Sequence, residues 1–217
     1  MGSCTAHAVA GAFEFEVQKQ GLPDFSPSRL FIWYNARAKS SVLHATKKNV
    51  GSSIREAIKS LNFKEHGVCS ESDWPYEVGK YNKKTRYFID NAKAARKPPA
   101  IVEKHAHLHT AAKYRAICAP NLREKLIQCL DQGYPFVFGM HTYGLLSKVN
   151  KHGRGLHKKN GTQGHAVMAV GYIQEQEVFI IRNSWGAHWG QNGHFYMPYE
   201  YILHCHDFWT INLPLPQ

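Results

Sequence analysis

The feature that most constrains this chain is the run at residues 181–190, Ile-Arg-Asn-Ser-Trp-Gly-Ala-His-Trp-Gly. Asn183 ends an apolar strand, Trp185 follows it, and Gly186 and Gly190 supply two sharp turns. A strand-end amide beneath an indole ring suits an Asn that holds another side chain in place. The run is equally typical of a glycine-rich, aromatic corner in an ordinary β-barrel, so other segments must distinguish the two interpretations.

The amino-terminal segment places Cys4 at the start of a helix. Small and apolar residues recur at helical spacing through residues 6–17, and Gly21 with Pro23 ends the run. The unpaired N–H groups and the positive dipole end at a helix start stabilise a thiolate. A free cysteine is more commonly a small buried apolar residue. Cys4 is therefore a candidate nucleophile whose role depends on the rest of the chain.

A second strand pattern supplies a candidate base. Residues 164–172 form an apolar run with His165 at its entrance, and a tight reversal at residues 174–176 leads into the strand that ends at Asn183. Such a reversal makes the two strands antiparallel neighbours. The far end of the second strand then lies beside the near end of the first. We therefore predict that Asn183 lies next to His165 and orients it.

Together these segments resemble the papain-like cysteine proteases (peptidase C1). The shared motifs are the Gly-Ser-Cys helix start, the Gly-His-Ala-Val strand and the Asn-Ser-Trp-Gly-x-x-Trp-Gly run. The segment at residues 69–76 is similar to the family's Tyr-Pro-Tyr segment. The Gly-Ser-Cys-Thr-Ala opening and the Met-Pro-Tyr-Glu-Tyr-Ile ending look most like prokaryotic and large-virus members. The resemblance covers nearly the whole chain.

The resemblance implies an α+β, papain-like two-lobed fold. A helical left lobe over residues 1–100 would carry the nucleophile helix, and an antiparallel, β-barrel-like right lobe over residues 101–217 would carry the His and Asn. The active-site cleft would lie between them. The implied activity is that of a cysteine endopeptidase, a thiol protease that forms an acyl-enzyme and needs no cofactor. The catalytic residues carried over are Cys4, His165 and Asn183; the substrate-binding residues are Gly51, Gly164 and Trp185; no metal ligand is assigned.

One departure from the family pattern concerns the oxyanion. The family stabilises it partly with a Gln six residues before the nucleophile, a position that would lie ahead of Met1. Loss of one oxyanion donor costs about 10²–10³ in rate. We therefore expect an N-terminally truncated chain, either a fragment of a longer protein or the product of a misplaced start. The alternative is a catalytically impaired papain-fold binding protein.

The resemblance implies a protein or peptide substrate, and a propeptide or cystatin-like inhibitor, for a monomeric enzyme. The charge of the chain bears on whether nucleic acid is a further partner. The net charge of +11 comes from 27 Lys and Arg against 16 Asp and Glu, with basic runs at residues 80–86, 93–97 and 148–159. No aromatic-interleaved motif accompanies them, so solvated faces are favoured over a nucleic-acid site.

No stretch is long and apolar enough to cross a membrane, and the start lacks the pattern of a signal peptide. We expect a soluble protein, cytoplasmic by default unless a missing N-terminal part carries a targeting signal. The five cysteines show no disulfide framework, which favours a reduced interior.

The remaining patterns predict the other elements. One helix begins at Ser26-Pro27, a second is capped by Ser53 and ended by Gly67, and a third is capped by Asn121. Strands are expected at residues 135–141, 165–173, 178–183, 194–197 and 208–212. The histidines at 105, 107 and 109 would share one face if extended, and residues 204–206 form a second His-Cys cluster; loop histidines of this kind usually stay unliganded.

Overall fold

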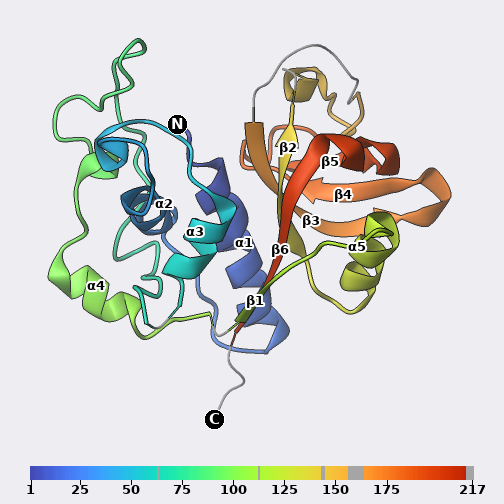
Figure 1. Cartoon of the computed structure of the whole chain (residues 1–217), viewed down its shortest axis with the longest axis horizontal. Coiled ribbons are helices and arrows are strands. Elements are labelled where there is room, and N and C mark those ends of the chain that lie inside the picture. The colour runs from blue at the N-terminus through green and yellow to red at the C-terminus, as the bar shows by residue number, and fades with distance from the viewer. Residues whose placement is uncertain (63, 112, 143–144, 156–163, 214–217) are drawn as a thin grey trace. The chain divides into compact units, whose positions relative to one another are not determined.

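The computed structural model describes residues 1–62, 64–111, 113–142, 145–155 and 164–213. The chain forms two compact units, residues 1–114 with the described residues 211–213, and residues 115–210 (Figure 1). Cys4 lies in the first unit, and His165 and Asn183 lie in the second. The lobe boundary expected after residue 100 stays a prediction.

The first unit is helical. Helix α1 (Cys4–Lys19) packs against α2 (Arg29–Ala38) and α3 (Ile54–Ser60), and α4 (Ala100–Ala106) follows later in the chain (Figure 1). Single 3₁₀ turns lie at Ala45–Lys47 and Lys93–Ala95. The predicted start of the first helix at Cys4 is confirmed. Most of α1 is buried, because small side chains let neighbouring helices approach on several sides.

Helix α2 begins later than the Ser26-Pro27 pattern predicted. Its N-cap is Ser28, whose Oγ accepts a hydrogen bond from the Phe31 N–H at 3.2 Å. Pro27 instead forms an antiparallel bridge with Ser70, which keeps the backbone before Ser28 extended. This pairing with a distant segment overrides the local preference for a helix start at Pro27.

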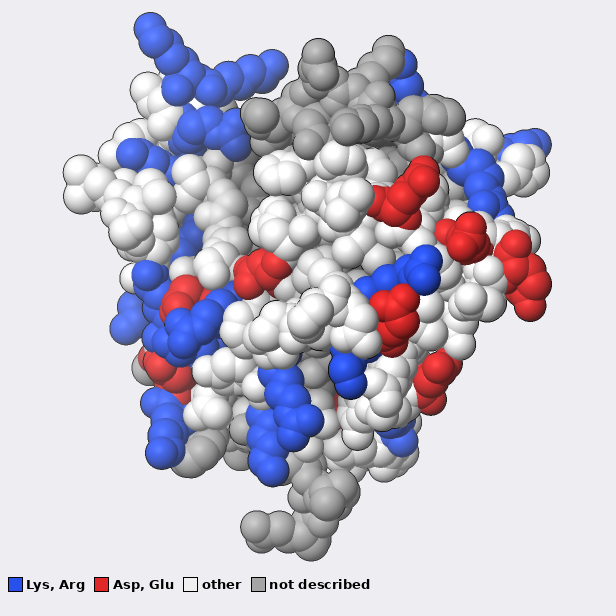
Figure 2. Space-filling view, turned by 45° about the vertical axis from the view of Figure 1, so that its right-hand side comes forward, with Lys and Arg blue, Asp and Glu red and all other residues white. Residues whose placement is uncertain are grey.

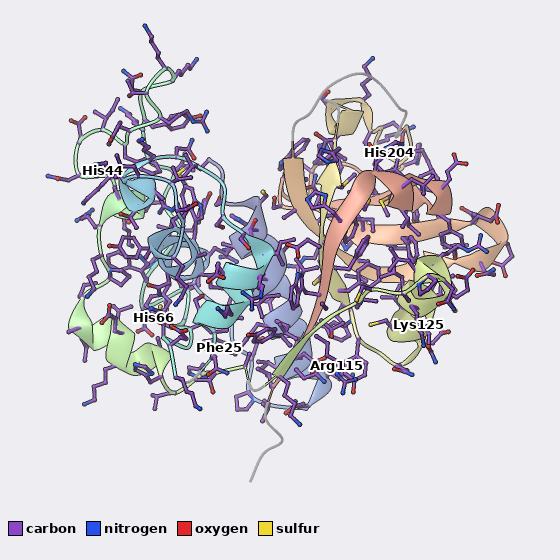
Figure 3. The ribbon with its side chains drawn as sticks, in the orientation of Figure 1. Phe25, His44, His66, Arg115, Lys125 and His204 are labelled. Atoms are coloured by element: carbon purple, nitrogen blue, oxygen red, sulfur yellow. The ribbon has the colours of Figure 1, made fainter. Side chains whose placement is uncertain are left out.

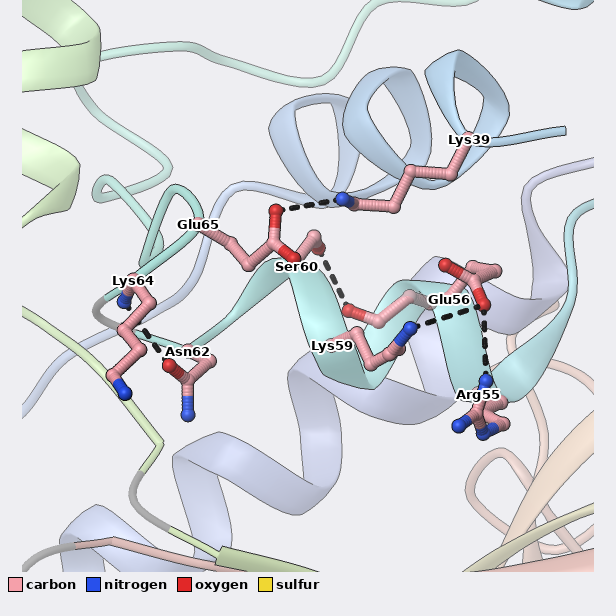
Figure 4. A network of polar contacts seen from close by, with 9 residues as sticks. Lys39, Arg55, Glu56, Lys59, Ser60, Asn62, Lys64 and Glu65 are labelled. Carbon is pink, nitrogen blue, oxygen red and sulfur yellow. Dashed lines mark hydrogen bonds and ion pairs between the residues drawn. The ribbon is translucent and has the colours of Figure 1, made fainter.

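Helix α3 begins where the sequence predicted and ends earlier. Ser53 caps it, and its Oγ accepts from the Glu56 N–H at 3.4 Å. Arg55 and Lys59 form ion pairs with Glu56 on its exposed side (Figure 4). The helix ends at Ser60, so the prediction that Gly67 ends it was wrong. Gly67 has a φ of +67°, and a Cβ there would lie 2.1 Å from the Ala106 carbonyl oxygen, so this position requires glycine for a close backbone approach.

The second unit is built on a six-stranded sheet in the order β1-β6-β2-β3-β4-β5 (Figure 1). The sheet is open, with β1 and β5 at its edges among the described residues. The β-rich half implied by the resemblance is confirmed, but its sheet is not closed into a barrel. Helix α5 (Leu122–Asp131) starts after Asn121 as predicted. The strands are β1 (Lys113–Ala116), β2 (Phe136–His141), β3 (Gly164–Ile173), β4 (Val178–Arg182), β5 (His194–Pro198) and β6 (Cys205–Asn212).

The pairing of β3 with β4 follows the prediction. The strands are antiparallel, joined by the 3₁₀ turn Gln174–Gln176, and their register runs from Ile173 opposite Val178 to Met168 opposite Arg182. A register shift lies between Ala169 and Gly171. The core under this sheet is aromatic and aliphatic, and includes Phe136, Phe138, Val167, Phe179, Ile181 and Phe195.

Lys and Arg side chains gather along the left side of the face in Figure 2. The basic run at residues 80–86 is largely exposed, whereas positions 156–159 of the third run lie outside the described residues. None of the five cysteines, all in the described part of the chain, forms a disulfide. No helix in that part is long and apolar enough to span a membrane.

Three histidines predict how stability depends on pH. Burial lowers the pKa of His7, of His66 (Figure 3) and of His109 below the ordinary value. The unfolded chain binds protons at these positions near the ordinary histidine pKa of 6.5, and the folded chain resists them. Stability should therefore fall as the pH drops below about 6.5. Urea midpoints at pH 7.5 and 5.5 test this.

The matched variant for this experiment is His109→Asn, because the half-buried His109 stacks on Phe25 with ring centroids 3.9 Å apart. The variant should lose less stability than the parent between pH 7.5 and 5.5. Equal midpoints at the two pH values in the parent would contradict the prediction.

Candidate active site

The candidate nucleophile lies at the start of α1, in the first unit. Cys4 is the first residue of the helix and is partly exposed, and Ser3 before it is 3% exposed. The N-cap Ser3 makes no side-chain capping bond, and its carbonyl accepts the first helical hydrogen bond from the His7 N–H at 3.1 Å. The thiol therefore stands at the positive end of a helix of 16 residues, where backbone N–H groups favour a thiolate.

The loop before α3 is fastened to this helix start. The Gly2 N–H donates to Asn49 Oδ1 at 2.6 Å, and Thr5 Oγ1 donates to the Ser52 carbonyl at 3.0 Å. A Cβ at Gly2 would lie 3.0 Å from the Val50 carbonyl carbon, so the two backbones touch. Gly51 is exposed on the same loop, and a Cβ there would meet nothing within 4 Å. Open space therefore adjoins the predicted substrate-binding glycine, in the same unit as Cys4.

Two arginines and a tryptophan donate hydrogen bonds to backbone carbonyls of this loop. Trp33 Nε1 donates to the Val50 carbonyl at 3.1 Å, and the Arg86 guanidinium donates to the Asn49 carbonyl at 2.9 and 2.7 Å. Arg37 Nη1 donates to the Lys48 carbonyl at 2.9 Å. The loop thus has few ways to move independently of the helix start.

The second unit holds the pair formed by His165 and Asn183. Nε2 of His165 lies 2.8 Å from Asn183 Oδ1. The Ser184 N–H donates to the same Oδ1 at 2.8 Å, so this atom must be the amide oxygen, an acceptor. His165 therefore carries its hydrogen on Nε2, which leaves Nδ1 as the nitrogen that can accept a proton. The predicted contact between these two residues is confirmed.

Aromatic rings and glycine turns fix this pair. The Trp185 ring lies 5.6 Å from the His165 ring and meets Trp189 edge-on at 5.2 Å. Gly186 and Gly190 have φ values of +87° and +57°, as expected for the turns. A Cβ at Gly190 would lie 2.4 Å from the His194 carbonyl oxygen. The turns thus place the indole of Trp185 beside the imidazole, at an interplanar angle of 46°.

Gly164 lies at the entrance of β3, opposite His141 of β2. It is exposed, and a Cβ there would meet nothing within 4 Å. His165, Asn183, Trp185 and Gly164 thus lie within one unit, around the ends of β3 and β4.

The other histidine clusters do not form metal sites. His105 lies inside α4, so residues 105–109 do not form the extended run in which the three imidazoles would share one face, and His204 ends a 3₁₀ segment before Cys205 begins β6. Among the described residues, no group of three or more His, Cys, Asp or Glu could hold a metal ion.

Sequence reasoning missed Asn49 and His7, which contact the residues just before Cys4. Asn49 lies in the loop before α3, near Gly51. His7 is a polar residue within an otherwise small and apolar helix segment. That polar interruption is the signal that could have directed attention to His7. Asn49 offered no comparable signal, because its partner is a backbone N–H distant in sequence.

A cysteine at a helix start and a His–Asn pair on an antiparallel sheet are the arrangement of a papain-type cysteine peptidase. Comparison with known proteins agrees. The family model described as "Papain family cysteine protease" matches residues 2–207. An uncharacterized peptidase C1-like protein of Acanthamoeba polyphaga mimivirus is 34% identical, with 97% of this chain and 67% of that protein covered. A cysteine protease of Blomia tropicalis is 26% identical, over 97% of this chain and 57% of its own length.

Solved structures give the same result. Xylellain, a cysteine protease from Xylella fastidiosa, superposes with a TM-score of 0.87 at 38% identity, covering 99% of this chain and 80% of that chain. A procathepsin L of Tenebrio molitor shares the fold, with a TM-score of 0.69 at 20% identity, over 98% of this chain and 64% of its own. The chain belongs to the papain family of cysteine proteases. The expected similarity to bacterial and large-virus members is confirmed.

Proposed function

We propose that this chain hydrolyses peptide bonds with Cys4 as nucleophile, His165 as base and acid, and Asn183 as the residue that orients the imidazole. The observation that carries the proposal is the 2.8 Å contact between His165 Nε2 and Asn183 Oδ1, which directs Nδ1 of the ring to proton transfer. The position of Cys4 at the start of α1 supports its role as a thiolate.

The reaction proceeds through an acyl-enzyme. His165 Nδ1 takes the Cys4 proton, and the thiolate attacks the peptide carbonyl carbon to form a C–S bond and an oxyanion. The Cys4 backbone N–H donates to that oxyanion. The C–N bond then breaks as the imidazolium gives its proton to the leaving amine. In the second half, His165 takes a proton from water as the water oxygen attacks the thioester carbon. The C–S bond then breaks, the imidazolium returns the proton to the Cys4 sulfur, and the acid product leaves.

Substrates in this proposal are proteins or peptides bound in an extended form. Gly51 pairs with substrate backbone, since a glycine beside open space allows a strand-like peptide to approach. Gly164 and Trp185 flank the reacting carbonyl next to His165. A propeptide or cystatin-like inhibitor would occupy the same surface, and the enzyme acts as a monomer without a cofactor.

Thiol labelling tests the assignment of Cys4. Burial raises the pKa of Cys69 to about 12 and also raises the pKa of Cys205, so these two thiols are poor nucleophiles. Iodoacetamide at neutral pH should therefore alkylate Cys4 at least about 10²-fold faster than Cys69 or Cys205. The exposed Cys118 is the matched comparison, because it is accessible without a base assigned to it. Peptide mapping by mass spectrometry gives each rate.

A bifunctional reagent tests the partnership of Cys4 with His165. The Cys4 thiolate should displace one bromide of 1,3-dibromoacetone, and His165 Nδ1 should displace the other, giving a three-carbon bridge between the two residues. A bridge from Cys4 to a different residue, or equal alkylation rates at Cys4 and Cys118, would defeat the proposal. The second outcome would favour the alternative, a catalytically impaired binding protein on the same fold.

A further inference from the structure

His7 lies one helical turn after Cys4 and bonds to the residue before it. Its Nδ1 lies 2.9 Å from the Ser3 carbonyl oxygen, which also accepts the His7 backbone N–H at 3.1 Å. A carbonyl oxygen can only accept, so Nδ1 of His7 must carry the ring hydrogen. Two N–H groups of one residue therefore donate to the Ser3 carbonyl.

The Ser3 carbonyl and the Cys4 N–H belong to the same planar peptide group. Hydrogen bonds into the carbonyl oxygen draw electron density from the nitrogen, and this polarisation makes the N–H a stronger donor. The same bonds fix the plane of the peptide and hence the direction of the N–H. In the proposed reaction the Cys4 N–H donates a hydrogen bond to the oxyanion, so this inference rests on the proposed function.

We propose that His7 is a positioning residue that orients and polarises the Cys4 backbone N–H for oxyanion binding. His7 touches neither the substrate nor the thiol in this role. It acts through one peptide group, and its effect belongs to the steps in which charge develops on the substrate oxygen.

The surroundings of His7 suit this role. Burial lowers its pKa, against the opposing influence of the bond to Ser3, so the ring donates while neutral at pH 7. The charged side chains that act on it are Arg29 and Glu71. Arg29 and Glu71 pair with each other at 3.1 Å, and the Tyr76 N–H donates to Glu71 at 2.6 Å. The Tyr76 ring meets the His7 ring edge-on at 4.9 Å and keeps it from rotating.

Two substitutions at the same position separate polarisation from packing. His7→Phe keeps a flat ring and removes the donor, whereas His7→Asn places an amide N–H near the position of Nδ1. Losing an oxyanion donor outright costs about 10²–10³ in rate, so weakening one should lower the kcat of His7→Phe about tenfold. KM should stay within a factor of about two, because the ground-state substrate carries no oxyanion. His7→Asn should recover most of the lost kcat.

Two readouts avoid dependence on turnover. Alkylation of Cys4 by iodoacetamide forms no oxyanion and should proceed at the parent rate in His7→Phe. A peptide aldehyde adds to the thiol to give a tetrahedral adduct that bears the oxygen, and its affinity should fall in parallel with kcat. Tyr76→Phe is the control: it removes the 2.8 Å hydrogen bond between the Tyr76 hydroxyl and Ser3 Oγ but leaves the bond to the Ser3 carbonyl intact. It should change kcat and aldehyde affinity by less than about twofold.

Three outcomes would overturn the inference: unchanged kcat and aldehyde affinity in His7→Phe, an equal loss in the alkylation rate, or no recovery in His7→Asn. Failure of the proposed function has a different signature. In that case Cys4→Ala would hydrolyse peptides like the parent, or the parent itself would neither hydrolyse peptides nor bind the aldehyde.

Discussion

Cys4→Ala should lower kcat/KM for peptide hydrolysis by at least about 10⁴-fold, the range seen when a nucleophile is removed from a catalytic group that acts as a unit. The variant keeps the helix start, because alanine is the best helix former and the segment is already rich in small residues. Its thermal midpoint should match that of the parent. A fluorogenic peptide amide chosen from a library gives the rates.

The partners of the nucleophile should behave as members of the same unit. His165→Ala should cost nearly as much as Cys4→Ala, and the double variant should lose little more than either single one, because neither group works without the other. Asn183→Ala should cost less, since the imidazole remains and only its 2.8 Å orienting bond is lost. Cys118→Ala is the matched control and should leave the rate unchanged. Additive losses in the double variant would contradict a shared mechanism.

Local chemistry explains which helices were predicted correctly. The start of α1 at Cys4 and the Ser53 cap of α3 depend on residues within one turn of the helix end, so the sequence carries their signals. The start of α2 was misplaced because Pro27 pairs with Ser70, a partner more than forty residues away. Strand β1, with the sequence Lys-Tyr-Arg-Ala, was missed because three of its four residues are exposed and show no apolar alternation.

The candidate site was predictable to the same extent. The contact of His165 with Asn183 follows from two strands joined by a short reversal, and the sequence contains all three parts. The bonds that hold the start of α1 could not be predicted. Asn49 reaches the Gly2 N–H across 47 residues, and its partner is a backbone group that every residue possesses. A sequence identifies side chains with distinctive chemistry; it does not identify which backbone groups they will meet.

Arg37 shows what such backbone contacts contribute to stability. Its side chain is 1% exposed and donates to the carbonyls of Trp33, Ala45, Thr46, Lys48 and Ala94, at 3.2 Å for Trp33 and Thr46 and 2.9 Å for Lys48. The guanidinium carbon lies 3.8 Å from the centre of the Trp33 ring. Burial lowers its pKa to about 10, so the group remains charged at neutral pH. No carboxylate in the described part of the chain forms an ion pair with it. Backbone carbonyls therefore take the place of water in solvating the Arg37 guanidinium.

Arg37→Met should consequently destabilise the protein by about 4 kcal/mol, because it removes a charged donor shared by five carbonyls, and a buried hydrogen bond lost without replacement costs about 1–3 kcal/mol. The Ala45 and Lys48 carbonyls keep their backbone donors, the N–H groups of Lys48 and Val50. Domains of this kind unfold at about 5–15 kcal/mol, so the variant should lose a large part of its stability and roughly 10 °C or more in thermal midpoint. The stability of Arg37→Lys should lie between that of the parent and that of Arg37→Met, since one ammonium cannot reach carbonyls on three segments at once. Thermal and urea denaturation measure both.

The control for this experiment is Arg55→Met on α3, whose side chain is 51% exposed and pairs with Glu56 at 3.5 Å (Figure 4). An exposed pair contributes roughly 0–1 kcal/mol, so the stability of this variant should resemble that of the parent.

Arg37→Met should also lower kcat at temperatures where it remains folded. Arg37 holds the Lys48 carbonyl, and the next residue, Asn49, binds the Gly2 N–H two positions before Cys4. A thermal midpoint within about 2 °C of the parent would show that the buried guanidinium does not fasten this loop. A loss of stability with kcat fully retained would show instead that the loop keeps its place at the nucleophile without Arg37.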